Sequence, residues 1–331
     1  MLSEFDLIKQ YFVRPARPAP LSPRAQLGIG DDCALLGITP GQSFAISSDM
    51  LVEGRHFFAG EDPRRLGHKS LAVNLSDLAA MGARPAGFTL ALALPAADRD
   101  WLAGFSAGLF ALADEHDCEL IGGDTTRGPL NICITVFGEV APGQALRRDA
   151  ARPGDDIWIS GTLGDARLAL AGIRGEVALQ EDAQQLAGAR LHLPTPRVAL
   201  GRLLAEGALA HAAIDISDGL AGDLGHILER SGVGATLDVD ALPAGPVLAT
   251  CASGHAALRR AYTAAGGDDY ELCFTAAPAR RGAIEAAGAA CGTPVTRVGR
   301  IEAAPGLRLT DGQGQPLELR LAGFDHFGGG Q

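Results

Sequence analysis

The sequence predicts an α/β protein of the α+β type with two domains. Apolar stretches of strand length alternate with stretches of helical periodicity, and this alternation begins again after the Pro153-Gly154 loop. A chain of 331 residues is long enough for two domains that each bury a core. We therefore expect one domain at residues 1–148 and a second at residues 149–331.

The composition indicates a folded protein and excludes several kinds of partner. Hydrophobic residues make up 47% and charged residues 20% of the chain, as in ordinary globular proteins. The net charge of -11 argues against general nucleic-acid binding, and no apolar run reaches the length of a membrane span. The six cysteines are scattered without a Cys-x-x-Cys pair, which indicates reduced thiols and a cytoplasmic location.

The first half of the chain begins with a short helix around residues 5–12, followed by a Pro- and Arg-rich linker. Asp62 and Pro63 are typical of a helix start, and the helical pattern that follows extends to Asp77. Lys69 is expected on the surface of this helix. Strand patterns cover residues 44–49, 88–94, 120–122 and 131–140, and an apolar-faced helix covers residues 101–113.

Acidic residues follow glycines or apolar stretches in this half. Residues 28–33 resemble the start of the glycine-rich dinucleotide-binding motif. However, Cys33 stands in place of the third glycine, and two aspartates stand where the pyrophosphate would bind. We therefore reject a Rossmann site. Ser47-Ser48-Asp49 ends a strand with hard oxygen ligands that suit Mg²⁺. Gly122-Gly123-Asp124 repeats this arrangement after another apolar strand. Asp77 lies in an apolar neighbourhood, where a carboxylate needs a cation or hydrogen-bond donors.

The second half begins with a basic loop at residues 147–155. The segment Asp215-Ile216-Ser217-Asp218-Gly219 joins an apolar strand to a helix, whose N-terminus favours anions such as phosphate. Gly266-Gly267-Asp268-Asp269 again combines glycines with carboxylates, and an aromatic tail surrounds Phe324. Strand patterns cover residues 156–160, 272–275 and 317–321, and helical patterns follow Gly164 and cover 197–206 and 220–228.

The recurring acidic segments are the main functional signal. Their carboxylates could converge on two or more magnesium ions, which would let an acidic protein bind phosphate. Gly67-His68-Lys69-Ser70 imitates the end of a P-loop, but Asp62 stands where the first glycine should be. The pattern therefore predicts metal-assisted phosphate chemistry without a P-loop. For each aspartate taken alone, a helix cap, a solvated turn or a satisfied core carboxylate is the alternative.

Six segments, taken in order, resemble one known family. They lie at residues 28–34, 46–49, 72–83, 121–126, 214–220 and 323–327, and they are similar to motifs of the thiamine-monophosphate kinase family, in the PurM-like superfamily of aminoimidazole ribonucleotide synthetase. The resemblance implies ATP-dependent phosphorylation of thiamine monophosphate to thiamine diphosphate, by direct in-line transfer assisted by several Mg²⁺ ions. It also implies two PurM-like domains, with a mixed sheet in the N-terminal domain that forms a homodimer and a C-terminal domain that completes the active site.

The resemblance implies roles for individual residues as well. Arg148, Asp49 and Asp124 match catalytic positions. Family positions that contact ATP are matched here by Gly123, Asp124, Arg148 and Ser217. Family positions that contact thiamine monophosphate are matched by His56, Asp268 and Phe324. The positions that match magnesium ligands are Asp32, Ser47, Ser48, Asp49, Asp77, Asp124, Asp215 and Asp218.

Two residues depart from the family pattern, and two alternative functions stay open. Asp268 stands where the family usually has Glu, which shortens the reach of the carboxylate. Phe324 stands where Tyr or Trp is common, which keeps ring stacking but removes a polar group. One alternative is another ATP-using PurM-like enzyme with a different acceptor. The other is a non-catalytic sensor of nucleotides or thiamine phosphates, against which the complete acidic set argues.

Overall fold

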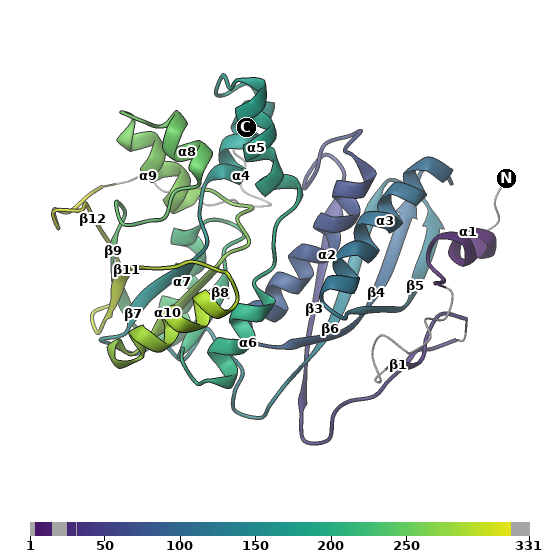
Figure 1. The fold of residues 1–331 in the computed structure, drawn as a ribbon, viewed down its shortest axis with the longest axis horizontal. Helices are drawn as coiled ribbons and strands as arrows, with labels where there is room; N and C mark the ends of the chain where they lie inside the picture. The colour runs from purple at the N-terminus through teal and green to yellow at the C-terminus, as the bar shows by residue number, and fades with distance from the viewer. Residues whose placement is uncertain (1–3, 15–24, 31, 319–331) are drawn as a thin grey trace. The chain divides into compact units, whose positions relative to one another are not determined.

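The computed structural model describes residues 4–14, 25–30 and 32–318, which divide into two compact units (Figure 1). The N-terminal unit contains the chain up to Leu78 and the segment Ala83–Gly143. The C-terminal unit contains Ala79–Gly82 and the chain from Gln144 onward. Phe324 of the predicted site lies outside the described residues.

The N-terminal unit is built on a four-stranded mixed sheet. Its strands lie in the order β3-β6-β4-β5, where β3 and β4 run antiparallel to β6 while β4 and β5 are parallel. This sheet agrees with the predicted fold class. The strands are β3 (Ser43–Val52), β4 (Arg84–Leu94), β5 (Glu119–Arg127) and β6 (Asn131–Val140), and a short pair, β1 (Ala25–Leu27) and β2 (Leu35–Leu36), precedes them.

Helices α2 (Pro63–Ala80) and α3 (Arg99–Glu115) lie over one face of this sheet, and α1 (Glu4–Tyr11) packs beside α3 and β5 (Figure 1). The predicted cap of α2 is confirmed, because the Asp62 carboxylate accepts the Arg65 N–H at 2.9 Å. The prediction that Lys69 lies on the surface is wrong, since this residue is only 6% exposed. Helix α2 is buried on nearly all sides after its first turn, so even its polar positions face protein.

A glycine lets α2 and α3 approach backbone to backbone. A Cβ built on Gly108 would lie 1.9 Å from the Arg64 carbonyl oxygen. Gly108→Ala should therefore force the helices apart and lower the free energy of unfolding in urea by about 1–3 kcal/mol. Gly282→Ala is the matched control, because a Cβ at this position of α10 (Arg281–Ala290) would meet nothing within 4 Å and should be neutral or stabilising. Equal losses in the two variants would contradict the close helix contact.

The C-terminal unit is built on a six-stranded sheet with the order β12-β9-β11-β7-β10-β8. β12 is parallel to β9, and every other neighbouring pair is antiparallel. Both faces of β7 and β10 are buried. The strands are β7 (Asp156–Ser160), β8 (Ala212–Asp215), β9 (Gly234–Asp238), β10 (Leu272–Ala276), β11 (Val295–Glu302) and β12 (Gly306–Thr310).

Helices complete two apolar cores in this unit. α7 (Leu220–Ser231) packs against β8, β9, β10 and β12, and its Leu224 and Ile227 belong to the main core. α6 (Val198–Glu206) packs against α10. A second cluster joins α4 (Asp165–Ile173), α5 (Glu181–His192) and α8 (Pro246–Cys251), with α9 (Ala256–Ala265) packed against it. Across the ranges that the structure describes, no helix combines the length and the apolar character needed to cross a membrane.

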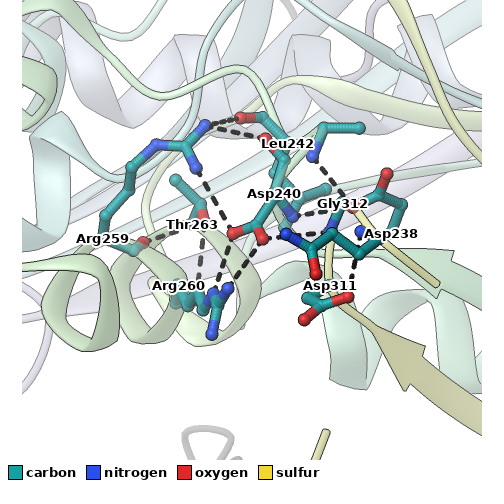
Figure 2. A network of polar contacts seen from close by, with 10 residues as sticks. Asp238, Asp240, Leu242, Arg259, Arg260, Thr263, Asp311 and Gly312 are labelled. Carbon is teal, nitrogen blue, oxygen red and sulfur yellow. Dashed lines mark hydrogen bonds and ion pairs between the residues drawn. The ribbon is translucent and has the colours of Figure 1, made fainter. Parts of the chain in front are cut away.

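An ion-pair network fixes α9 to the end of β9 and to the turn after β12 (Figure 2). Arg260 donates two hydrogen bonds to the Asp240 carboxylate, at 2.8 and 2.7 Å. Arg259 donates to the carbonyl oxygens of Asp240 and Leu242, at 3.1 and 2.8 Å, and the Gly312 N–H donates to Asp240 at 3.0 Å. Because α9 leads into the Gly266-Gly267 segment, this network also anchors that segment at its N-terminal side.

The network predicts a pH dependence of stability. The hydrogen bond from Arg260 is the main cause that lowers the pKa of Asp240 to about 2. This value lies below the unfolded one of about 3.9, so the stabilisation is complete above about pH 4 and is lost as the pH falls through about 2. Wild type should exceed Asp240→Asn in unfolding free energy by about 1 kcal/mol at neutral pH, because the pair is partly exposed to solvent. Urea denaturation of both proteins between about pH 7 and 3 should show the difference in unfolding free energy shrink as the pH falls below about 4. A difference that does not change with pH would contradict the prediction.

Candidate active site

Strand β3 and helix α2 bring Ser47, Asp49 and Asp77 together. Ser47 and Asp49 are two positions apart, so they project from the same face of β3. The Ser47 hydroxyl donates a short hydrogen bond to Asp77 Oδ2, and Asn74 Oδ1 accepts the backbone N–H of Asp49 at 3.1 Å. Sequence reasoning missed Asn74. Its position three residues before Asp77, on the same side of a helix, is the signal that could have found it.

The electrostatics of this group favour a bound cation. Burial, and then the charge of Asp77, raise the pKa of Asp49 to about 6. Two neighbouring carboxylates repel each other when both are ionised, and a divalent ion removes that repulsion. Carboxylate and hydroxyl oxygens are also the ligands that Mg²⁺ prefers. The three side chains could therefore hold a divalent cation.

Ser48 lies on the opposite face of β3. Its hydroxyl is 2.9 Å from Thr135 Oγ1 and donates to the Ile134 carbonyl oxygen at 3.2 Å, both on β6. The alternation of side chains along a strand requires this separation from Ser47 and Asp49. The Ser48 hydroxyl is thus not on the face that carries the Asp49 carboxylate.

Gly123 and Asp124 lie on β5, at the other edge of the sheet from β3. With two strands between them, β3 and β5 are roughly 14 Å apart. A Cβ on Gly123 would lie 1.9 Å from the Leu90 carbonyl oxygen, and its φ is 147°, so only glycine fits here. Asp124 is in register with Ala91 and, through it, with Met50 on the exposed face of the sheet. Within one chain, the sheet does not bring Asp124 to Asp49.

His56 and Asp32 occupy loops of the same unit. His56 lies in the turn after β3, where its Nδ1 accepts the Val52 N–H at 3.0 Å. Since Nδ1 is an acceptor there, the proton of the neutral ring is on Nε2. Asp32 is exposed in the bend between β1 and β2.

In the C-terminal unit, a carboxylate that sequence reasoning missed holds Ser217 and Asp218. Asp215 ends β8 in a buried position, and the chain then turns into α7. Asp223 Oδ2 accepts the backbone N–H groups of Ser217 and Asp218, at 3.1 and 3.2 Å. Burial, and then the charge of Asp218, raise the pKa of Asp223 to about 7. An acidic residue in a first helical turn that reaches back to preceding N–H groups is a capping pattern, which is the signal that could have found it.

The Ser217 segment also contacts the segment that carries Asp268. The Asp268 N–H donates to the Ser217 carbonyl oxygen at 2.8 Å. Arg148 lies nearby before β7, where its carbonyl oxygen accepts a hydrogen bond from Ser231 Oγ at 2.9 Å. Its positive charge acts on Asp223 and opposes the rise in the pKa of that carboxyl group. The C-terminal unit therefore brings Ser217, Asp218 and Asp268 close together just after the end of β8.

Comparison with known proteins identifies the family. The model of the N-terminal domain of AIR synthase related proteins matches residues 30–140, and the model of their C-terminal domain matches residues 152–312. A thiamine-monophosphate kinase of Salmonella typhimurium is 47% identical over 98% of each chain, and one of Escherichia coli K12 is 48% identical over 98% of each. The chain belongs to the thiamine-monophosphate kinases of the AIR synthase related family.

Solved structures of this family share the fold. A thiamine-monophosphate kinase from Stenotrophomonas maltophilia K279a has a TM-score of 0.82 and 48% identity, covering 89% of this chain and 93% of that one. AaThiL complexed with AMPPCP and TMP has a TM-score of 0.76 and 29% identity, covering 88% and 89%. Hydrogenase maturation protein HypE, at 22% identity and a TM-score of 0.76 over 97% and 94% of the chains, shares the fold alone. The predicted two-domain PurM-like fold and the family resemblance are confirmed.

Proposed function

We propose that this thiamine-monophosphate kinase family member transfers the γ-phosphoryl group of ATP to thiamine monophosphate, giving thiamine diphosphate and ADP. The observation that carries the proposal is 47% and 48% identity, over 98% of the chain, to relatives named thiamine-monophosphate kinase. The AaThiL complex with AMPPCP and TMP supports a nucleotide and thiamine monophosphate as the two substrates. The Ser47–Asp77 contact beside Asp49 supports metal assistance.

We assign Mg²⁺ as the metal. In the N-terminal unit Ser47, Asp49 and Asp77 would hold it, with Asp32 and Ser48 as further ligands, and in the C-terminal unit Asp215 and Asp218 would do so. Ser48 would contribute its backbone, because its hydroxyl is bonded to β6. When bound, Mg²⁺ offsets the negative charge of two phosphates that must approach each other.

The chain's own residues position the reactants. A phosphate oxygen of thiamine monophosphate attacks the γ-phosphorus in line, and the bond to the β,γ-bridging oxygen breaks so that ADP leaves. That attacking oxygen is already ionised at neutral pH, so no general base is required. Gly123, Arg148 and Ser217 would hold ATP, with Arg148 stabilising charge on the transferring group. His56, Asp268 and Phe324 would hold the acceptor.

The exposed face of the N-terminal sheet supports a homodimer. Phe44, Ile46 and Met50 of β3 are 39%, 60% and 54% exposed and form a row of apolar side chains. A second copy of the chain would remove this row from water. Asp124 lies on this same face at the far edge of the sheet, and we propose it as a ligand of a magnesium ion other than the one at Asp49. All six cysteines are unpaired, which supports a cytoplasmic location.

Coupled ADP release tests the function. The wild-type protein is incubated with magnesium and ATP and with thiamine monophosphate, thiamine or no acceptor. We expect release with thiamine monophosphate and a product whose mass is that of thiamine diphosphate. ATP binding without acceptor-dependent release would favour another ATP-using PurM-like enzyme with a different acceptor, or a sensor.

A further inference from the structure

The segment at residues 267–271, which carries Asp268, has a strained backbone. Asp268 and Tyr270 have φ angles of 64° and 48°. This left-handed conformation costs a residue with a side chain roughly 1–2 kcal/mol, and it persists only where surrounding contacts determine it. The contacts around this segment therefore decide where Asp268 points.

Several contacts fix the residues around Asp269. The N–H groups of Asp268 and Tyr270 donate to the carbonyl oxygens of Ser217 and Ile216, both at 2.8 Å. The buried Asp269 carboxylate accepts the Gly164 N–H, at 2.9 and 3.1 Å from its two oxygens. The carbonyl group of Asp269, which lies between the two left-handed residues, requires a donor of its own.

Arg190 of α5 supplies that donor. Its Nη2 donates to the Asp269 carbonyl oxygen at 2.9 Å and to Glu271 Oε1 at 2.8 Å. Glu271 is 0% exposed and also accepts two hydrogen bonds from Arg197, at 2.6 and 2.5 Å, and one from Ser160 at 2.6 Å. Of these three donors, Arg190 is the one that bonds to the backbone of the segment as well as to the carboxylate.

We propose that Arg190 is a positioning residue for the phosphate acceptor, because its bonds to Asp269 and Glu271 hold the backbone at Asp268 in its left-handed conformation. The proposal rests on the proposed function and on Asp268 as a contact to thiamine monophosphate. The shorter Asp in place of the usual Glu makes the position of the backbone more important, since the side chain has less length to compensate for a displacement.

Loss of Arg190 leaves no uncompensated charge at Glu271. The carboxylate keeps both bonds from Arg197 and the bond from Ser160. What is lost is the bond to the Asp269 carbonyl oxygen and one of several donors to Glu271. The effect should therefore fall on the geometry of the segment more than on the stability of the unit.

Three variants separate positioning from stabilisation. Arg190→Met should raise the KM for thiamine monophosphate about tenfold, the scale of one charge-assisted hydrogen bond, while kcat and the KM for ATP change less than about twofold. Arg190→Lys should restore the wild-type KM, because both bonds of Arg190 come from one nitrogen and one ammonium can supply both. Arg197→Lys is the matched control. This substitution breaks the bidentate hydrogen bond to the same carboxylate. It should therefore lower the thermal midpoint of unfolding and leave the KM for thiamine monophosphate unchanged.

Hydrogen exchange gives a readout that does not need activity. The amides of Asp268 and Tyr270 should exchange faster in Arg190→Met than in wild type and in Arg197→Lys. An unchanged KM and unchanged exchange in Arg190→Met, or an equal rise of KM in Arg197→Lys, would overturn the proposal. Wild-type protein that releases no ADP with thiamine monophosphate would instead refute the kinase function, and the exchange rates would still test whether Arg190 holds the backbone of the 267–271 segment. If Arg190→Met does not fold, Arg190→Gln replaces it.

Discussion

Asp49→Asn should lower turnover with magnesium, ATP and thiamine monophosphate by at least about 10³-fold. The amide keeps the shape of the carboxylate but removes the negative charge that a divalent ion requires. Asp49 contacts Asn74 through its backbone N–H, so the substitution leaves that hydrogen bond in place. The fold should therefore persist while the metal site is lost.

The same substitution should stabilise the metal-free protein. Burial and the charge of Asp77 raise the pKa of Asp49 to about 6, above the unfolded value of about 3.9. An acid with a raised folded-state pKa destabilises the fold increasingly as the pH rises from about 4 to about 6. In chelator-treated protein near neutral pH, Asp49→Asn should raise the free energy of unfolding by about 1–3 kcal/mol.

Opposite signs for activity and stability distinguish a metal ligand from a structural carboxylate. Asp100→Asn, an exposed acid on α3 of the same unit, is the control and should change neither quantity appreciably. Turnover of Asp49→Asn close to wild type at saturating magnesium would remove Asp49 from the metal site. A loss of stability at neutral pH would show that the charge at Asp49 is balanced within the protein.

The fold was predictable where periodicity and turn chemistry agree. Helix α2 starts at the predicted cap, and strands β7 and β10 lie where apolar runs predicted them. Helix α5 was missed because only Ala187, Gly188 and Leu191 are buried on it, too few to mark an apolar stripe. Arg190, which lies on that helix, was missed with it.

The site was predictable as a set of residue types but not as an arrangement. Asp49 and Asp77 are far apart in sequence and meet because α2 packs over β3, a packing that periodicity does not encode. The strand order places β5 and its Asp124 at the opposite edge from β3. Asn74, Asp223 and Arg190 act through backbone groups of their neighbours, so no motif of ligand-type residues marks them.

Glu271→Ala should lower the free energy of unfolding by about 3–5 kcal/mol, the cost of breaking a buried ion pair by removing one partner. The carboxylate is fully buried and receives bonds from Arg190, Arg197 and Ser160. Its removal leaves two mostly buried guanidinium groups without their shared acceptor. Urea denaturation monitored by circular dichroism measures the loss.

An exposed ion pair of the same unit provides the control for Glu271. Arg202 and Glu206 on α6 contact each other at 2.9 Å, but their side chains are 39% and 56% exposed. Glu206→Ala should therefore cost at most about 0.5 kcal/mol, since water replaces the lost partner. Comparable losses in the two variants would mean that burial does not set the strength of the Glu271 network. In that case the bond from Arg190 to Glu271 would contribute little to holding the strained 267–271 segment, and the bond from Arg190 to the Asp269 carbonyl oxygen would have to hold it alone.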